Sequence, residues 1–395
     1  MKTKLLLFAS LFLFSGIAHA QLSAENYNKK NVLFFAPRAM VGYVLPTNDF
    51  LKGANNQGSP INWYNSQSLG LAVQTTGNRE WHHVLNFPYY GGGVYTAGFP
   101  QDTEMGRPFA IYGYMGIPLK RTEKHTFGYE LAFGFATNWD RYDPVTNPNN
   151  ITIGSYSTVY IGANLVWSWE ISPLLDLRAG VGFTHFSNGA MRKPNKGLNL
   201  AAPLVELSYR LEEMPKLERE VPPPYKQHNE IAIQASFSAK QEEYGSSVEG
   251  VHSTIGNFRS YNLSTAYMRQ ITWKNKFGVG VDVSYDTQGA LTTSQDEHGN
   301  VMLHTSDKFS DRFVLSPYGT YEFVVNRLSL ASSLGFYLYR QKPQGGAPFL
   351  YQRIGLKYHF KNDMFMSILV RAHSFSVADL IEWGVGYRIK WGKGC

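Results

Sequence analysis

The sequence predicts an all-β protein: a transmembrane antiparallel up-and-down β-barrel of about 14–16 strands that follows a cleaved signal peptide. Three observations support this fold class. The chain of 395 residues begins with an export signal. Segments in which apolar and polar residues alternate recur from end to end, and aromatic residues make up 15% of the chain. The links between these segments are short and long in turn, as in barrels of the bacterial outer membrane.

The export signal occupies residues 1–20. Lys2 and Lys4 give it a charged start, LLLFASLFLF is its apolar core, and the pattern Ala-His-Ala precedes Gln21 as a cleavage site. We expect cleavage after Ala20 and delivery of the mature chain to the outer membrane. No later run of about 18 or more apolar residues occurs, so no spanning helix is expected.

The composition agrees with a barrel and limits the classes of binding partner that are expected. The chain holds 25 Tyr, 25 Phe, 8 Trp and 37 Gly. Apolar and polar residues alternate in a barrel strand because one face meets lipid and the other meets the lumen. The formal net charge of +7 is modest for this length. Export excludes nucleic acid as a partner, whereas an anionic membrane surface fits a weakly basic chain.

The first half of the chain contains eight alternating segments. Tight links at 77–79, 121–124 and 172–173 are expected on the periplasmic side, with the longer loops at the outer surface. His82 and His83 interrupt the pattern of one segment. The predicted strands cover about residues 32–45, 66–77, 81–91, 108–119, 126–138, 156–170, 174–187 and 198–212.

The second half repeats this pattern, with tight turns at 274–275, 326–327 and 361–363 and a long outer loop at 288–308. The total is about sixteen strands, and closure of a barrel favours an even number. The predicted strands of this half cover about residues 230–240, 259–273, 277–287, 312–325, 328–340, 349–360, 364–373 and 380–391.

One segment, EEMPKLEREVPPPYKQHNE (212–230), is rich in charge and proline. It is either a linker between two eight-stranded barrels or one long periplasmic turn within a single barrel. The alternation of long and short links continues through it in phase, which favours a single barrel. We therefore divide the mature chain into a first half (21–212), a periplasmic turn or linker (213–228) and a second half (229–395).

A candidate site lies at the end of LLDLRAGVGFTHFS (174–187), where the odd positions are mostly apolar and the even ones include Asp176, Arg178 and Thr184. The odd positions should face lipid, so His185 and Ser187 share the lipid-facing side at the outer end of this strand. The same alternation in LNLAAPLVELSYRL (198–211) puts Asn199 on that side too.

This pattern suits nucleophilic catalysis. Serine becomes nucleophilic when an adjacent base takes its proton, and a histidine two positions earlier on the same face can be that base. A third group must orient the imidazole. Asn188 and the backbone N–H of Gly189 follow directly and could stabilise an oxyanion. The spacing alone also fits an interfacial histidine beside a loop-capping serine.

The stretch THFSNGAMRKPNKGLNL (184–200) resembles the signature of the outer-membrane lipid A 3-O-deacylase, or acyloxyacyl hydrolase, family, which carries a His-x-Ser-Asn stretch followed by Pro-Asn-x-Gly. Other stretches are similar to the long, Bacteroidetes-type form of this family. They are NFPYYGGGVYTAGF (86–99), PFAIYGYMGIP (108–118), NPNNITIGS (147–155) and ADLIEWGVGYR (378–388).

The resemblance implies a role for each matching residue. Ser187 would be the nucleophile, His185 the general base, and Asn188 with the Gly189 amide the oxyanion hole. Asn199 occupies the place of the glutamate that orients the histidine in the best-known members of the family.

An asparagine in that place can accept a hydrogen bond from an imidazole but stabilises an imidazolium less than a carboxylate does. Asp140 or Asp143, in the neighbouring outer loop, is the alternative orienting residue. Glu206 is a poor substitute because the alternation turns it toward the lumen.

The implied activity is that of an outer-membrane esterase that removes an ester-linked acyl chain, by expectation the 3-O chain, from lipid A of lipopolysaccharide. Arg192, Lys193 and Lys196 follow the nucleophile and could hold lipid A phosphates. No cofactor is implied, and no residue cluster has the spacing of a metal site. The alternative is a porin-like or structural barrel with a vestigial site.

Overall fold

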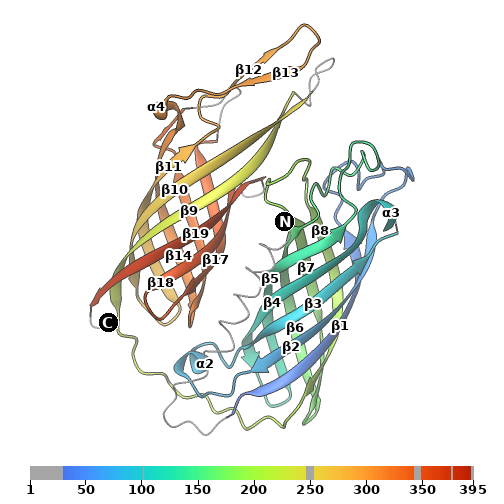
Figure 1. Ribbon diagram of the computed structural model, residues 1–395. Helices are drawn as coiled ribbons and strands as arrows, with labels where there is room; N and C mark the ends of the chain where they lie inside the picture. Colours follow the sequence, from blue (N-terminus) through green and yellow to red (C-terminus); the bar gives the residue numbers. More distant parts are fainter. Residues whose placement is uncertain (1–29, 101, 246–252, 342–347, 375–376, 393–395) are drawn as a thin grey trace. The chain divides into compact units, whose positions relative to one another are not determined.

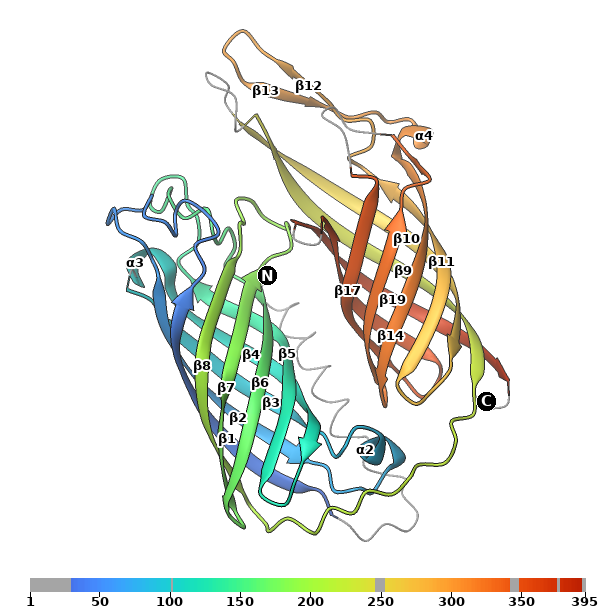
Figure 2. The ribbon, with the colours of Figure 1, turned by 180° about the vertical axis from the view of Figure 1, so that it is seen from behind.

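The computed structural model of the protein (Figures 1 and 2) describes residues 30–100, 102–245, 253–341, 348–374 and 377–392. The predicted signal peptide (1–20) lies outside the described residues. No helix in the described part of the chain has the length and apolar character needed to cross a membrane. The described residues are nearly all strand, as predicted.

The first eight strands close into an antiparallel barrel. They are β1 (Val32–Val44), β2 (Trp63–Gln74), β3 (Tyr89–Gly98), β4 (Gly106–Arg121), β5 (His125–Trp139), β6 (Thr158–Ser172), β7 (Leu175–Ser187) and β8 (Leu198–Arg210). Two short helices, α2 (Glu80–Val84) and α3 (Asp102–Met105), flank β3. The last strand closes the ring by pairing with the first, and Arg38 lies opposite Glu206 in their register.

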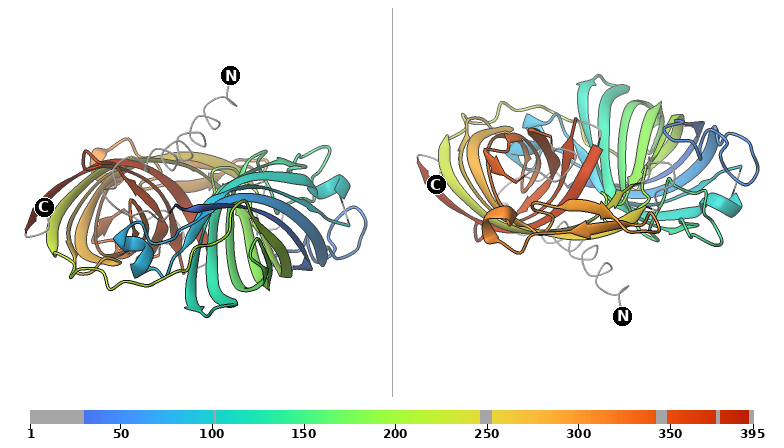
Figure 3. Two further views of the ribbon diagram at one scale, coloured as in Figure 1. Left: turned by 90° about the horizontal axis from the view of Figure 1, so that it is seen from below. Right: turned by 90° about the horizontal axis from the view of Figure 1, so that it is seen from above.

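The remaining strands form a second closed ring, in which β19 pairs with β9 and β11 with β14. Its strands are β9 (His228–Tyr244), β10 (Thr254–Gln270), β11 (Asn275–Asp286), β14 (Phe313–Val325), β15 (Leu328–Phe336), β17 (Leu350–His359), β18 (Met364–His373) and β19 (Val377–Gly392). The short β16 (Tyr339–Arg340) also pairs with β14. The strands of each barrel curve round to close in Figure 3.

The preference for one large barrel is therefore wrong, although the total of sixteen barrel strands agrees with the prediction. The alternation along a strand shows which side chains face lipid, but it does not show which edge that strand pairs with. Eight strands are enough to close a barrel that side chains can fill. The segment 211–227 thus connects two barrels, and the chain divides into two compact units near Pro223.

The prediction of a strand at 81–91 is also wrong, since α2 occupies its start and the strand of this region is β3. Glycine is a poor strand former, so the strand propensity of the segment around Gly91 and Gly93 is low and did not indicate β3. In the structure they allow close packing. A Cβ on Gly91 would lie 2.2 Å from the Leu71 carbonyl oxygen, and one on Gly93 would lie 2.8 Å from the Tyr112 ring.

Part of the loop predicted at 288–308 forms a hairpin of its own, made of β12 (Thr292–Gln295) and β13 (Val301–His304). The short helix α4 (Phe309–Arg312) follows it and leads into β14. Both belong to the outer end of the second barrel. The other predicted strands agree with the structure apart from shifts at their ends.

Buried ion pairs fill the lumen of the first barrel. Arg38 reaches Glu130 at 2.8 Å and Glu206 at 2.5 Å, while Arg178 lies 3.0 Å from Glu206. These four side chains are at most 8% exposed. Buried charges of opposite sign compensate one another's loss of hydration, so the network fixes β1, β5, β7 and β8 together.

The second lumen is filled in the same way. Lys276 lies 2.8 Å from Glu230, Arg353 lies 2.9 Å from Asp282, and Arg371 lies 2.5 Å from Glu382. Each of these side chains is at most 7% exposed. The charges pair across the barrel instead of lining an open aqueous path, as expected for an eight-stranded barrel.

Replacing Arg38 should destabilise the first barrel strongly. Arg38→Met leaves Glu130 and Glu206 without their shared cation, and the expected cost is about 3–5 kcal/mol of unfolding free energy. Urea unfolding of protein refolded in liposomes, followed by tryptophan fluorescence, measures it. Lys52→Met removes an exposed pair with Asp49 and should cost about 0–1 kcal/mol. Equal stability of both variants would contradict the role of the lumen network.

Candidate active site

The outer end of β7 carries the predicted catalytic pair on its outward face. Val181 and Phe183 are 57% and 39% exposed, whereas Thr184 and Phe186 are buried. The side chains alternate along the strand, so His185 and Ser187 lie on the same side as the two exposed apolar residues. The long outer connections follow β7 directly, and the tight turn before Leu175 marks the opposite end of the strand.

Pairing of β7 with β8 brings the third predicted residue into contact. His185 lies directly opposite Asn199 in the register of these strands. The imidazole Nδ1 and the Asn199 Oδ1 are 2.6 Å apart, so Nδ1–H donates to the amide oxygen. This hydrogen bond fixes the tautomer and leaves Nε2 with a free electron pair that can accept a proton.

The serine has a partner that the sequence reasoning missed. Asn195 Nδ2 donates to Ser187 Oγ at 2.9 Å, and Asn195 Oδ1 accepts from the backbone N–H of Asn188 at 3.3 Å. The second bond fixes which end of the amide meets the serine. A signal for Asn195 was present in the sequence, because it is the asparagine of the Pro-Asn-x-Gly stretch that follows the serine.

Gly197 packs against both members of the catalytic pair. A Cβ on this residue would lie 3.3 Å from His185 Cε1 and 3.8 Å from Ser187 Cβ. Its φ of +75° also belongs to the left-handed region that glycine adopts at little cost. A glycine here lets the chain pass close to the imidazole and the serine on its way into β8.

The outer loop 140–157 supports the site from the β6 side. Asn188 Nδ2 donates to Ser155 Oγ at 3.1 Å, so the side chain of Asn188 is directed toward this loop. After the turn, the backbone N–H of Lys196 donates to the Ile151 carbonyl at 3.0 Å. The backbone N–H of Gly197 donates to the Thr152 carbonyl at 3.1 Å. The loop therefore holds the segments before and after the 189–194 turn.

The alternative orienting residues do not contact the imidazole Nδ1, which Asn199 engages. Asp143 Oδ1 instead accepts hydrogen bonds from the backbone N–H groups of Thr146 and Val145, both at 3.0 Å. These bonds hold the pKa of Asp143 below its usual range. The carbonyl of Asp140 accepts from Asn150 at 2.7 Å. Glu206 faces the lumen, as the alternation predicts.

The residues after Asn188 form a tight turn. Gly189 and Ala190 have φ values of +58° and +62°. A left-handed alanine costs roughly 1 kcal/mol, and such strain often accompanies functional sites. Arg192 and Lys196 are exposed and Lys193 is half-buried. Residues 189–193 group with the second compact unit, in which Lys193 N–H donates to Gln241 Oε1 at 2.9 Å.

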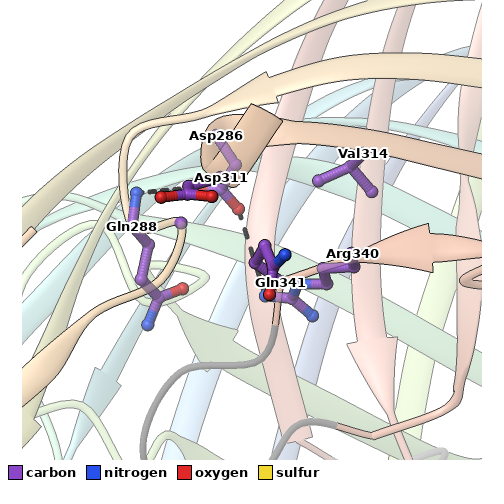
Figure 4. Close-up of a pocket in the computed structure, with 7 residues that line it drawn as sticks. Asp286, Gln288, Asp311, Val314, Arg340 and Gln341 are labelled. Atoms are coloured by element: carbon purple, nitrogen blue, oxygen red, sulfur yellow. Dashed lines mark hydrogen bonds and ion pairs between the residues drawn. The ribbon is translucent and has the colours of Figure 1, made fainter. Parts of the chain in front are cut away.

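One pocket, shown in Figure 4, lies at the outer end of the second barrel and contains none of the predicted site residues. Asp286, Gln288 and Arg340 are among the residues that line it. Asp286 Oδ1 accepts from the Gln288 backbone N–H at 3.0 Å, and its other oxygen lies 4.0 Å from Arg340. No group of His, Cys, Asp and Glu in the described residues is arranged to hold a metal ion.

Comparison with known proteins gives two family matches that together span most of the chain. Residues 59–208 match the model of lipid A 3-O-deacylase (PagL), and residues 229–391 match that of the acyloxyacyl hydrolase C-terminal domain. The first match contains the whole site, and the second corresponds to the second barrel. No curated protein sequence matches the chain.

Among solved structures, the toluene transporter TodX of Pseudomonas putida is similar at 9% identity and a TM-score of 0.17, covering 93% of this chain and 90% of its own. The siderophore receptor PirA of Pseudomonas aeruginosa is similar at 7% identity and a TM-score of 0.25, covering 93% and 82%. Neither similarity is close enough to bear on function. The two family matches, however, show that this chain belongs to the lipid A 3-O-deacylase (acyloxyacyl hydrolase) family of outer-membrane hydrolases.

Proposed function

We propose that the protein hydrolyses the 3-O-linked acyl ester of lipid A by a serine mechanism on the outward wall of the first barrel. The observation that carries this proposal is the hydrogen bond between His185 and Asn199 on the same face as Ser187. The Ser187 hydroxyl in turn accepts a hydrogen bond from the side-chain amide of Asn195. A nucleophile, a base with a fixed tautomer and an oxyanion donor are the parts that acyl transfer requires.

In the first step Ser187 Oγ attacks the ester carbonyl carbon while His185 Nε2 takes the hydroxyl proton. The carbonyl oxygen becomes an oxyanion. We assign Asn195 Nδ2 as its side-chain donor, alongside the predicted Gly189 amide. The Asn188 side chain instead donates to Ser155, and its backbone N–H donates to Asn195. Asn199 keeps the imidazole in place through Nδ1. Collapse of the intermediate breaks the bond to the sugar oxygen, which leaves with the proton from His185.

In the second step water attacks the acyl-serine with His185 Nε2 again as the base. The Ser187 Oγ bond to the acyl carbon breaks, serine regains its proton, and the free fatty acid is released. Asn199 is a weaker partner for the imidazolium than a carboxylate, so it orients the ring and adds little charge stabilisation. Each proton taken by the base is returned within the cycle, and the overall reaction consumes one water.

An outward site suits a membrane lipid as substrate. Lipid A can diffuse laterally along the outer leaflet to the barrel wall, with its acyl chains against the exposed apolar face of β7 and its sugars above it. Arg192, Lys193 and Lys196 remain the proposed contacts for lipid A phosphates, because they follow the nucleophile in the chain.

The alternative of a porin-like barrel receives no support from the two lumens. Both are crossed by buried ion pairs between strands that are not neighbours, such as Arg38 with Glu130 and Arg353 with Asp282. A conducting pore would need these pairs to separate, which leaves buried charges uncompensated.

The central test replaces the nucleophile. Cells that express the wild type should show lipid A lacking one 3-O-acyl chain by mass spectrometry, and cells that express Ser187→Ala should not, because no other group supplies the attacking oxygen. Ser172→Ala, at the opposite end of the barrel, is the matched control and should behave as wild type. Unchanged acylation in every strain, together with solute flux through the purified protein, would support the pore.

The orienting role of Asn199 predicts an ordered series. Asn199→Ala should lower kcat by about 100-fold, because the imidazole loses the partner that fixes its tautomer. Asn199→Glu should retain or raise activity, since a carboxylate accepts the same hydrogen bond and stabilises the imidazolium. Fatty-acid release from purified lipid A measures both variants. An alanine variant as active as wild type would exclude Asn199 from this role.

The contact between Asn195 and Ser187 predicts a loss confined to the chemical step. Asn195→Ala should lower kcat by about 100- to 1,000-fold with little change in KM, because the oxyanion donor acts in the transition state. Asn149→Ala is the control. This exposed residue lies on the neighbouring outer loop and should have no effect. A rise in KM alone would assign Asn195 to substrate binding instead.

A further inference from the structure

A cation with free donors lies in the outer loop that supports the site. The guanidinium carbon of Arg141 is 4.3 Å from the ring centroid of Tyr156, so the two groups stack. Arg141 Nη1 makes only a long hydrogen bond of 3.5 Å to the Tyr142 carbonyl, and Nε has no partner. Arg141 also interacts electrostatically with the Asp143 carboxylate and helps to lower its pKa.

Arg141 and Tyr156 stand at the two ends of the same loop, held together beside the nucleophile. The Tyr142 backbone N–H donates to the Ile153 carbonyl at 2.7 Å, which brings the ends of the loop side by side. Ser155, next to Tyr156, accepts from Asn188 Nδ2 at 3.1 Å. Consecutive Cα atoms are about 3.8 Å apart, so this chain of contacts puts Tyr156 within reach of a ligand bound at Ser187.

We propose that Arg141 and Tyr156 form a headgroup subsite for a phosphorylated, acylated glucosamine lipid, with the phosphate on Arg141 and the sugar ring on Tyr156. This inference rests on the proposed function, since it names the group of the substrate that the site recognises besides the ester. It adds Arg141, a residue outside the basic turn at 192–196, to the proposed phosphate contacts.

The chemistry of the two side chains selects this ligand. A guanidinium presents its N–H donors in a plane that matches two phosphate oxygens, and stacking on an aromatic ring uses the face of that plane and not its edge. The Nε of Arg141 is buried without a partner. The Tyr156 side chain is 63% exposed and offers an amphipathic ring surface. Asp143, the carboxylate with which Arg141 interacts electrostatically, already accepts two backbone N–H groups of its own turn.

The orientation of the subsite also fits a lipid substrate. Ser187 lies on the outward face of β7, and the loop 140–157 stands above the outer end of the adjacent β6. A lipid whose ester reaches Ser187 from the membrane carries its sugar and phosphate upward, toward this loop. Recognition of phosphate would then align the ester with the nucleophile instead of merely holding the lipid.

Binding measurements test the subsite without any need for hydrolysis. The probes are a synthetic glucosamine with 2-N- and 3-O-acyl chains and a 1-phosphate, and the same lipid without phosphate. Full-length Ser187→Ala in detergent should bind the phosphorylated lipid about 10- to 100-fold more tightly by calorimetry. Adding Arg141→Gln should abolish that preference, and Arg141→Lys should restore part of it.

Two matched variants sharpen the comparison. Arg107→Gln removes an exposed arginine from the outer end of β4, three strands from β7, and should keep the full preference. Lys196→Gln removes one of the proposed phosphate contacts of the basic turn and should weaken binding of the phosphorylated lipid without abolishing the preference. A preference that survives Arg141→Gln, or that disappears in Lys196→Gln alone, would overturn the subsite. Heat-dependent gel mobility verifies that each variant is folded.

Hydrolysis separates this inference from the function on which it rests. With Ser187 present, Arg141→Gln should lower kcat/KM about 10- to 100-fold for the phosphorylated lipid and leave the other lipid unchanged. An equal loss of kcat/KM on both lipids would show that Arg141 only stabilises the loop and does not bind phosphate. If the wild type released no fatty acid from either lipid, the deacylase proposal would fail, while the binding preference would still decide the role of Arg141.

Discussion

The pairing of every backbone N–H and C=O within a closed ring is the constraint on which the rest of this structure depends. A bilayer offers no water to an unpaired strand edge, so the chain must close each sheet before it can remain in lipid. It does so twice, through β1 with β8 and through β9 with β19. Closure fixes which strands are neighbours, and the neighbours determine which side chains meet.

The candidate site follows from that closure and from alternation. His185 and Asn199 are fourteen residues apart in the chain, yet adjacent antiparallel strands place them directly opposite each other on one face. Charged residues of the opposite faces pair inside the barrel, as Arg178 does with Glu206. The lumen thus provides rigidity, and the proposed chemistry is left to the outer wall, which a lipid can reach. The second barrel repeats the filled lumen, and within the described residues its pocket lies at its own outer end.

The outer loops bring further side chains to the candidate site. Asn195 returns to the serine only because the turn after Ser187 folds back, and its amide is fixed by the Asn188 backbone. The loop 140–157 holds both sides of this turn by backbone and side-chain hydrogen bonds. Arg141 and Tyr156 belong to the same loop, so the geometry that supports Ser187 also positions a cation and an aromatic ring beside the candidate site.

The sequence by itself determined the fold class and the approximate positions of nearly all strands, because a two-residue period can be recognised along one chain. The same period predicted the outward face of β7 and placed His185, Ser187 and Asn199 on the outward side. It misplaced β3, whose glycines hide a strand that packing stabilises. Only the tertiary structure decided that β8 closes onto β1, since period-2 alternation is the same in one barrel or two. Only it brought Asn195 to Ser187 and Arg141 to Tyr156, because turns and loops bring side chains together by backbone paths that no periodicity encodes.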